Sequence, residues 1–409
     1  MYANAARKSK KIAIQLMIGP GQMEKFSENE IVERLDFSLE ALEPDELILS
    51  IHEDYGDLAR KIVEHCGGKN VNVSLWTMVF ADRAASLSRL PLVRDFKGRE
   101  GYGAIAAWNG MGKGDEKFLF CCPSAMLDDD KGILRAVEAA QEIGAQGVFL
   151  DRIRYPSPAN GLEYLGACSC SACTKAFYRD NGMDWPDLVR EMVNWAAYGR
   201  EGAVKFRDAH KPAREFRAKM VATAVSRYSE AVHGAGLRVG LDLLAPALSD
   251  IVGQDYALLS RNADFIKPML YCKASAPAGL PLEFRLLMEG LSRSGVETSR
   301  ARQFVAELSG IEDEHLKAVQ LGGSFPASLA ASQMSRAKRE ADGRNDHRAD
   351  VYAGIELVDH EDYETKINEA ARDAYLEALS RENIALCWNI LYIPRNHIMA
   401  VAKLRKDFQ

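Results

Sequence analysis

Short apolar segments alternate with longer amphipathic segments along most of the chain. The short segments are rich in Val, Ile and Leu, as strands buried on both faces are, and the longer ones repeat apolar residues at helical spacing. The predicted strands are residues 12–18, 46–51, 71–77, 147–151, 238–243, 264–270, 352–356 and 384–389. The predicted helices are residues 28–42, 57–66, 130–143, 214–233, 249–260 and 363–380. This alternation is typical of βα units around a parallel sheet.

Eight predicted strands of this kind favour an α/β fold, the (β/α)8 TIM barrel. A doubly wound open sheet is the alternative, but no glycine-rich dinucleotide or P-loop fingerprint follows a predicted strand. Residues 118–122 could form a ninth strand or part of an insertion. Long connections follow the fourth and sixth strands, at residues 155–212 and 272–350. We therefore expect a single TIM-barrel domain over residues 1–409, with both insertions on the catalytic face.

Composition changes this picture little. The chain has 409 residues, 47% hydrophobic and 27% charged, which is enough for a large core. The net charge of −6 provides no basic surface, so we expect no nucleic-acid partner. No apolar run approaches the ~18 residues of a membrane span, so we expect no membrane partner. The first residues lack a signal-peptide core, which predicts a cytoplasmic protein unless a leader has been removed. Nothing in the sequence indicates an oligomeric state.

Acidic residues at strand ends are the first candidates for chemistry, because TIM barrels carry their catalytic residues there. Asp151 ends the fourth strand, Asp242 lies late in the fifth, and Glu356 ends the seventh. Two such acids at one barrel mouth could act as nucleophile and general acid/base on a glycosidic bond. We rank Asp151 and Glu356 first and Asp242 third. The competing interpretation is that each acid forms a structural ion pair with a neighbouring arginine or lysine.

Candidate substrate-binding residues lie at or beyond the same strand ends. Sugars need flat apolar faces for their C–H bonds and polar groups for their hydroxyls. The aromatic candidates are Trp76, Trp108, Tyr155, Tyr271 and Trp388, and the polar candidates are Arg154, Lys267, Asn389, Glu53 and His52. A lysine inside a strand is costly if it is buried without a partner, so Lys267 suggests a polar or anionic substrate. The alternative is that the aromatic residues belong to the core.

Four segments resemble, in the same order, motifs of glycoside-hydrolase-like TIM-barrel families. Leu150-Asp-Arg-Ile-Arg-Tyr-Pro156 resembles their D-Y-I-R-[YF]-P signature, with Arg152 where the families often have tyrosine. Asp264-Phe-Ile-Lys-Pro-Met-Leu-Tyr271 is similar to their D-x-[IV]-x-P-M-x-Y strand, and Ala353-Gly-Ile-Glu356 to their late G-[IV]-[QE] strand. The segment from Cys168 to Cys173, followed by Phe177, is similar to their C-x-C-x-x-C…F insert.

The resemblance implies a (β/α)8 barrel that acts on carbohydrate without an organic cofactor. Carried onto this chain, Asp151 would be the nucleophile or the acid/base, with Glu356 or Asp242 as its partner. An arrangement like that of α-amylases favours Asp151 as nucleophile. The two-glutamate arrangement of other barrels would reverse the roles of Asp151 and Glu356. We therefore predict a glycoside hydrolase or a related transglycosylase.

Cys168, Cys170 and Cys173 form the only dense group among the 8 cysteines, which argues against a disulfide framework. Their spacing is compatible with a structural, tetrahedral zinc site. The local sequence lacks a fourth ligand, for which His210, Cys66 and Cys272 are candidates. The alternative is a loop of reduced thiols, or two of them oxidised during handling.

Two other functions compete with glycoside hydrolysis. The C-x-C-x-x-C pattern also occurs in tRNA-guanine transglycosylases, which are TIM barrels that exchange a base in RNA. The histidine that these enzymes place after the cysteines and their glycine-rich loop are missing, and a net negative charge suits RNA poorly. The other competitor is a catalytically silent barrel that only binds carbohydrate.

Overall fold

The computed structural model describes residues 10–81, 91–100, 102–103, 118–127, 131–165, 168–342, 349–361 and 365–406. Trp108, one of the aromatic candidates, lies outside these residues. Among the described helices, none is both long and apolar enough to cross a membrane.

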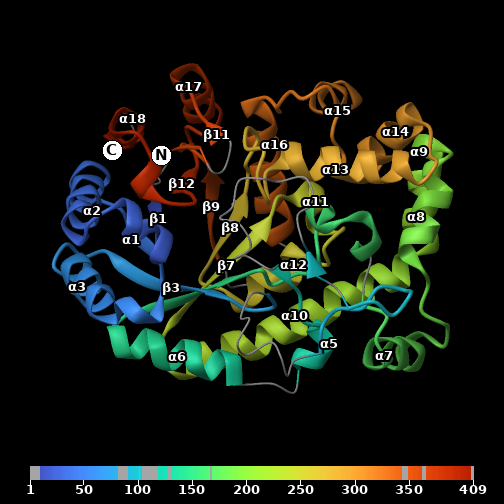
Figure 1. The fold of residues 1–409 in the computed structure, drawn as a ribbon, viewed down its shortest axis with the longest axis horizontal. Helices are drawn as coiled ribbons and strands as arrows, with labels where there is room; N and C mark the ends of the chain where they lie inside the picture. Colours follow the sequence, from blue (N-terminus) through green and yellow to red (C-terminus); the bar gives the residue numbers. More distant parts are fainter. Residues whose placement is uncertain are drawn as a thin grey trace, which may run out of the picture.

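Eight parallel strands close into a barrel, which confirms the TIM-barrel prediction and excludes the open sheet (Figure 1). In order around the barrel they are β1 (Ile12–Ile18), β2 (Glu46–Ile51), β3 (Asn72–Met78), β6 (Gly147–Asp151), β7 (Arg238–Leu244), β8 (Phe265–Met269), β9 (Asp350–Ile355) and β12 (Asn383–Leu386). The predicted strands match these within one or two residues, except that the eighth ends three residues earlier than expected.

Helices pack around the outside of the barrel (Figure 1). Those that follow barrel strands directly or close a βα unit are α1 (Pro20–Lys25), α2 (Glu28–Leu42), η1 (Glu53–Tyr55), α3 (Gly56–Gly67), α6 (Lys131–Ile143), α10 (Lys211–Gly234), α16 (Ala327–Ala341), α17 (Glu369–Ala378), η5 (Ile390–Tyr392) and α18 (Arg395–Lys406). Local signals set several of their ends. For example, Ser27 and Glu30 form a capping box at the start of α2.

The helix predicted over residues 249–260 was wrong. The chain instead forms α11 (Pro246–Ser249), α12 (Tyr256–Leu259) and η4 (Ser260–Asn262). Gly253 between them has a φ of +72°, which breaks a helix. The side chain of Gln254 folds back to accept a hydrogen bond from the backbone of Leu244 at 2.8 Å, and Asp255 caps α12. Side-chain bonds to the backbone thus replace a continuous helix.

Three insertions follow strands of the barrel. The first, after β3, contains β4 (Tyr102–Gly103), β5 (Phe118–Leu119) and α5 (Pro123–Met126), so residues 118–119 belong to a separate two-stranded sheet and not to the barrel. After β6 come η2 (Pro158–Asn160), η3 (Leu162–Tyr164), α7 (Ser171–Asn181), α8 (Leu188–Ala196) and α9 (Gly199–Ala209). After β8 come α13 (Leu280–Arg293), α14 (Thr298–Ser309) and α15 (Asp313–Gln320). A small hairpin, β10 (Asp359–His360) with β11 (Thr365–Lys366), follows β9.

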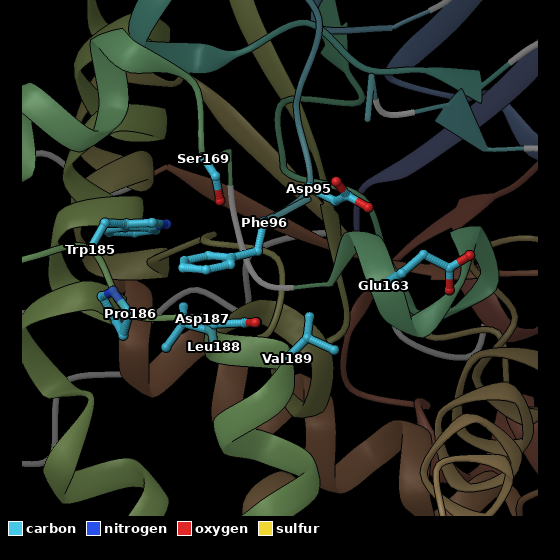
Figure 2. A pocket seen from close by; sticks show the side chains of 9 residues that line it. All are labelled: Asp95, Phe96, Glu163, Ser169, Trp185, Pro186, Asp187, Leu188 and Val189. Atoms are coloured by element: carbon cyan, nitrogen blue, oxygen red, sulfur yellow. The ribbon is translucent and has the colours of Figure 1, made fainter. Parts of the chain in front are cut away.

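The insertions after β6 and β8 pack on each other beside the barrel. Phe206 of α9 meets Phe304 of α14 edge to face at 5.9 Å, and α8, α9 and α14 lie side by side in Figure 1. A pocket of about 230 Å³ opens between the insertions after β3 and β6 (Figure 2). Its walls include Phe96, Trp185 and Glu163, and none of the candidate acids at the strand ends.

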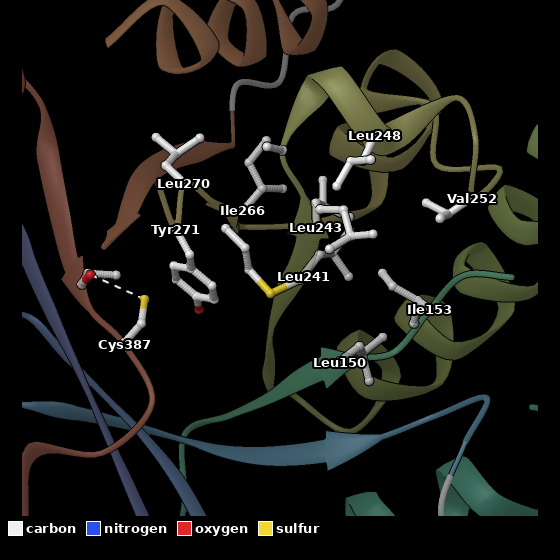
Figure 3. Close-up of a cluster of buried hydrophobic side chains, with 14 of the residues drawn as sticks. Leu150, Ile153, Leu241, Leu243, Leu248, Val252, Ile266, Leu270, Tyr271 and Cys387 are labelled. Carbon is white, nitrogen blue, oxygen red and sulfur yellow. Dashed lines mark hydrogen bonds between the residues drawn. The ribbon is translucent and has the colours of Figure 1, made fainter. Parts of the chain in front are cut away.

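The barrel interior is filled by side chains from alternate strand positions. Phe149 and Phe265 stack there with ring centroids 5.7 Å apart. Gly240 lies between them in the register, and a Cβ at this position would come within 2.3 Å of Phe265 and 2.5 Å of Phe149. Only glycine therefore fits here. The strand residues between these inward-facing positions, such as Leu150 and Leu241, face outward and join an apolar cluster with the surrounding helices (Figure 3).

Candidate active site

Asp242 and Lys267 form a fully buried ion pair in the barrel interior. They lie opposite each other in the register of β7 and β8, two residues beyond the Gly240–Phe265 pair toward the carboxyl ends of the strands. The Lys267 Nζ is 3.1 Å from the Asp242 Oδ2, and both side chains are 2% exposed or less. The strand period of two explains the placement, because Phe265 and Lys267 share the inward face.

Lys267 connects four strands of the barrel. Its Nζ donates to the Tyr271 hydroxyl at 3.0 Å and to the Gln15 Oε1 at 3.4 Å, and it lies 3.5 Å from the Cys387 Sγ. Burial disfavours the charged amine, but Asp242, Cys387 and Asp151 outweigh it and raise the pKa of Lys267. The ammonium is therefore charged, and it holds the polar side chains of the barrel mouth together.

Asp151 is the more accessible of the two acids. It is the last residue of β6 and is 8% exposed. The Trp76 Nε1 donates to its Oδ2 at 3.0 Å, and the backbone N–H of Arg152 donates to its Oδ1. Arg152 has a φ of +54°, a left-handed conformation that is uncommon for a non-glycine residue and is often found at functional sites. The chain therefore turns sharply at Arg152, directly after the strand residue that carries this carboxylate.

The two acids differ in environment. Burial and the negative charge of Asp151 raise the pKa of Asp242 to about 7, against the opposing charge of Lys267. Arg154 lies close enough to both acids to sense their charge, and its guanidinium lies 4.9 Å above the ring of Phe120. Burial lowers the pKa of Arg154, and the charges of Glu283, Asp151 and Asp242 oppose that shift. The mouth of the barrel thus collects two acids and two cations in a low-dielectric setting.

Two buried polar atoms beside Lys267 have no hydrogen-bond partner among the described residues. They are the Oδ1 of Asp242 and the Nε2 of Gln15. Buried polar groups in folded proteins are almost always satisfied, and exceptions call for a water or a ligand. The pair offers one acceptor and one donor, which is what a hydroxyl group requires. Sequence reasoning missed Gln15, although a glutamine inside the apolar run of β1 is the same kind of signal as Asp242 between two leucines.

Three of the aromatic candidates lie beside this cluster. Trp76 donates to Asp151, and Tyr271 accepts from Lys267. The rings of Tyr271 and Trp388 meet edge to face at 5.4 Å. Trp388 has a φ of +70°, and its backbone N–H donates to Gln15. Trp76 and Trp388 are only partly buried.

Glu356 is placed differently from our expectation. Its carboxylate accepts the backbone N–H groups of Lys273 and Ala274 at 2.7 and 3.1 Å and the hydroxyl of Tyr375 at 3.0 Å. These bonds fix the loop after β8, and none goes to Asp151. Burial raises the pKa of Glu356 to about 7. β9 ends at Ile355, so Glu356 lies just beyond the strand, and its role as the partner of Asp151 stays a prediction.

Three other candidates are held in structural contacts or lie apart. Tyr155 is buried against Arg217 of α10, with the guanidinium 5.2 Å from its ring. Asn389 donates to the backbone of Met17 at 2.7 Å and caps η5, so both ends of its amide are occupied. Glu53 is exposed in η1. In the described part of the chain, no hydrogen bond joins any of the three to Asp151 or Asp242.

A fourth cysteine joins the predicted group. The Sγ atoms of Cys122, Cys168, Cys170 and Cys173 all lie within 4.8 Å of one another. Our candidates for the fourth ligand, His210, Cys66 and Cys272, do not belong to this group. The signal for Cys122 was the pair of adjacent cysteines at positions 121–122, but only the fold shows that they approach a loop almost fifty residues away.

No family model and no curated protein matches the chain. Among solved structures, α-L-fucosidase isoenzyme 2 from Paenibacillus thiaminolyticus is 12% identical over 98% of this chain, with a TM-score of 0.48. This chain spans 49% of the fucosidase, about half its length. A class V chitinase from Pseudomonas fluorescens Pf-5 is 10% identical, covering 97% of this chain and 100% of the chitinase, with a TM-score of 0.49. The α-N-acetylgalactosaminidase NagBb from Bifidobacterium bifidum is 11% identical, covering 98% of this chain and 52% of that enzyme, with a TM-score of 0.42. At these TM-scores none of the three assigns an activity.

Proposed function

We propose that this protein cleaves or transfers glycosidic bonds, with Asp151 and Asp242 as its two catalytic carboxyl groups. The observation that carries the proposal is the pair itself. The two acids come from neighbouring strands at one barrel mouth, and one is buried with a pKa near 7 and an unpartnered oxygen. Two titratable groups whose environments differ in this way are the usual basis for separate acid and nucleophile roles.

Asp242 suits the role of general acid and base. A pKa of about 7 lets the group both give and take a proton near neutral pH, and Oδ1 is the oxygen that has no partner among the described residues. In the first step Asp242 gives this proton to the glycosidic oxygen as the bond to the anomeric carbon breaks. In the second step its carboxylate takes a proton from the attacking water or sugar hydroxyl.

Asp151 suits the role of nucleophile. Both of its oxygens accept N–H groups, from Trp76 and from Arg152, which orients the carboxylate at the strand end. In the first step one oxygen forms a bond to the anomeric carbon, and in the second step that bond breaks as the acceptor oxygen attacks. Lys267 is a positioning residue here, since its charge stabilises the Asp242 carboxylate after the proton has left.

The surroundings of the acids fit a sugar better than an apolar ligand. The faces of Trp76 and Trp388 provide walls for C–H stacking. The Nε2 of Gln15 provides a donor for a hydroxyl oxygen, and the Oδ1 of Asp242 provides an acceptor. The positive charges of Lys267 and Arg154 favour a sugar with an acidic or strongly polar substituent.

A panel of aryl glycosides, including uronic acid and deoxy-sugar types, tests the proposal. We expect the wild type to hydrolyse at least one of them and Asp151→Asn to lose that activity. A 2-deoxy-2-fluoro glycoside of the same sugar should label Asp151, which peptide mass spectrometry identifies. Glu46→Gln is the matched control, because Glu46 is also a buried barrel carboxylate but lies at the opposite end of the strands. Glycan binding by a wild type that hydrolyses nothing would instead indicate a silent carbohydrate-binding barrel.

A further inference from the structure

The four clustered cysteines have the geometry of a metal site. The Cys122 Sγ lies 3.2 Å from that of Cys173 and 3.7 Å from that of Cys170. A Zn–S bond of about 2.3 Å implies sulfur–sulfur edges of about 3.8 Å in a regular tetrahedron. The two separations lie at or below this value, and no sulfur–sulfur distance in the group exceeds 4.8 Å. A disulfide requires about 2.05 Å. The thiols are therefore arranged around a common centre and not in covalent pairs.

The ligands come from two insertions that are far apart in the sequence. Cys122 begins α5 in the insertion after β3, and the other three lie in the insertion after β6. Cys170 caps the eleven-residue helix α7 and Cys173 lies in its first turn, where the helix dipole stabilises a thiolate. Cys168 accepts the backbone N–H of Arg94 at 3.4 Å, and Ser169 donates to the Arg94 carbonyl at 2.8 Å. The bond from Ser169 to Arg94 thus places the ligand loop independently of the sulfur atoms, and the Arg94 N–H orients the Cys168 sulfur.

We propose that Cys122, Cys168, Cys170 and Cys173 bind one Zn²⁺ ion that joins the two insertions. Soft thiolate ligands select zinc over Mg²⁺, Ca²⁺ and Mn²⁺. Four protein ligands leave no open position for water or substrate, so the ion is structural. Three of the sulfur-bearing residues are buried and Cys170 is half-buried, which limits exchange with solvent. Each thiol loses its proton to solvent on binding, so zinc affinity rises with pH.

A short series of contacts connects the cysteine cluster to the barrel mouth. Phe120, two residues before Cys122, lies under the guanidinium of Arg154 at 4.9 Å. Arg154 in turn senses the charges of Asp151 and Asp242. Zinc that fixes the insertion after β3 therefore also fixes the surface on which Arg154 rests. Metal loss is expected to loosen this corner of the mouth while the barrel strands stay folded.

Elemental analysis of protein prepared under reducing conditions with zinc in the medium tests the proposal. We expect one zinc per chain in the wild type and less than about a tenth of that in Cys122→Ser. Cys121→Ser is the matched control, because Cys121 is the adjacent buried cysteine and does not belong to the cluster. It should keep full zinc content. Cobalt reconstitution should give the visible spectrum of tetrahedral thiolate coordination in the wild type and in Cys121→Ser only.

Thiol titration of the wild type keeps the test decisive if Cys122→Ser does not fold. A strong chelator should release the zinc and expose four additional reactive thiols without loss of the far-UV circular dichroism signal. Three results would overturn the proposal: a wild type without metal, iron in place of zinc, or disulfides within the group in protein that has never been oxidised. Full zinc content in Cys122→Ser would remove Cys122 from the ligand set and with it the joining of the two insertions.

Discussion

The two ends of the barrel interior each hold a buried acid paired with a cation. At the amino-terminal end Glu46 accepts from the hydroxyl of Ser74 at 2.5 Å and from Arg238 at 2.6 Å. At the carboxyl-terminal end Asp242 pairs with Lys267 at 3.1 Å. Burial raises the pKa of both acids to about 7. By their own burial and pKa alone, the two acids cannot be told apart.

The difference between the pairs lies in what remains unsatisfied. Each oxygen of Glu46 has a hydrogen-bond partner within the protein. These bonds connect β2 to Ser74 of β3 and to Arg238 of β7. The Oδ1 of Asp242 has no partner among the described residues, and a second acid, Asp151, lies close by. A buried ion pair is therefore weak support for a functional site, and the unpartnered atom beside a second titratable group is what distinguishes Asp242 from Glu46.

The largest expected effect separates the two ends by activity. Asp151→Asn should lower kcat by about 1000-fold or more, because the covalent route loses its nucleophile. Glu46→Gln should keep kcat within about threefold, since a substitution at the Glu46–Arg238 pair affects folding and not chemistry. Steady-state kinetics on the best aryl glycoside measures both. Near wild-type kcat in Asp151→Asn would remove this residue from the catalytic role.

The next effect separates the ends by stability. Lys267→Met should lower the free energy of unfolding by about 3 kcal/mol, because it leaves a fully buried acid without its cation. Arg238→Met should cost about 1 kcal/mol or less, since the Arg238 side chain is 34% exposed and water can replace it beside Glu46. Urea unfolding measures both changes.

A second substitution checks the reason for the first result. Adding Asp242→Leu to Lys267→Met removes the stranded charge and should recover part of the lost stability. If the double variant is less stable than Lys267→Met, the cost came from packing around the lysine and not from the unpaired acid.

Much of the barrel could be predicted from the sequence, because strands buried on both faces are short apolar runs with clear ends. Asp151 and Asp242 could be found for the same reason, since a charged residue inside such a run stands out. Glu356 shows the limit of this reasoning. We predicted that it ends the seventh strand, but β9 ends one residue earlier and the carboxylate binds the backbone of Lys273 and Ala274.

Contacts between distant segments could not be predicted. Cys122 joins the other three cysteines only because the insertions after β3 and β6 fold against each other. The helix expected over residues 249–260 failed for a local reason, the return of the Gln254 side chain to the backbone of Leu244. Periodicity carries no information on either kind of contact.

Both buried acids make the stability of the folded protein depend on pH. The pKa of both acids is raised above the unfolded values of 3.8 for Asp242 and 4.5 for Glu46. The folded protein therefore binds more protons between about pH 4 and 7, and its stability falls as pH rises through that window, by at most about 1.4 kcal/mol per pH unit for each acid. Glu46→Gln should flatten this dependence, as urea unfolding at several pH values would show.

Activity should respond to only one of the two titrations. The value of kcat/KM should fall as pH rises through about 7, because Asp242 then loses the proton that it donates. Glu46→Gln should leave this limb of the profile in place. If the fall of kcat/KM shifted to another pH in Glu46→Gln, the titration of Glu46 would affect catalysis, and the two ends would not differ in function.

The smallest effect concerns the orientation of Asp151. Trp76→Phe keeps an aromatic wall but removes the Nε1 donor that lies 3.0 Å from the Asp151 Oδ2. The loss of one hydrogen bond to a charged group should lower kcat by about tenfold, or about 1.4 kcal/mol, with little change in KM. Trp195→Phe, in α8 of the insertion after β6, is the control and should leave kcat unchanged. A rise in KM with constant kcat would instead assign Trp76 to sugar stacking, since the indole face and not its N–H would then carry the contribution.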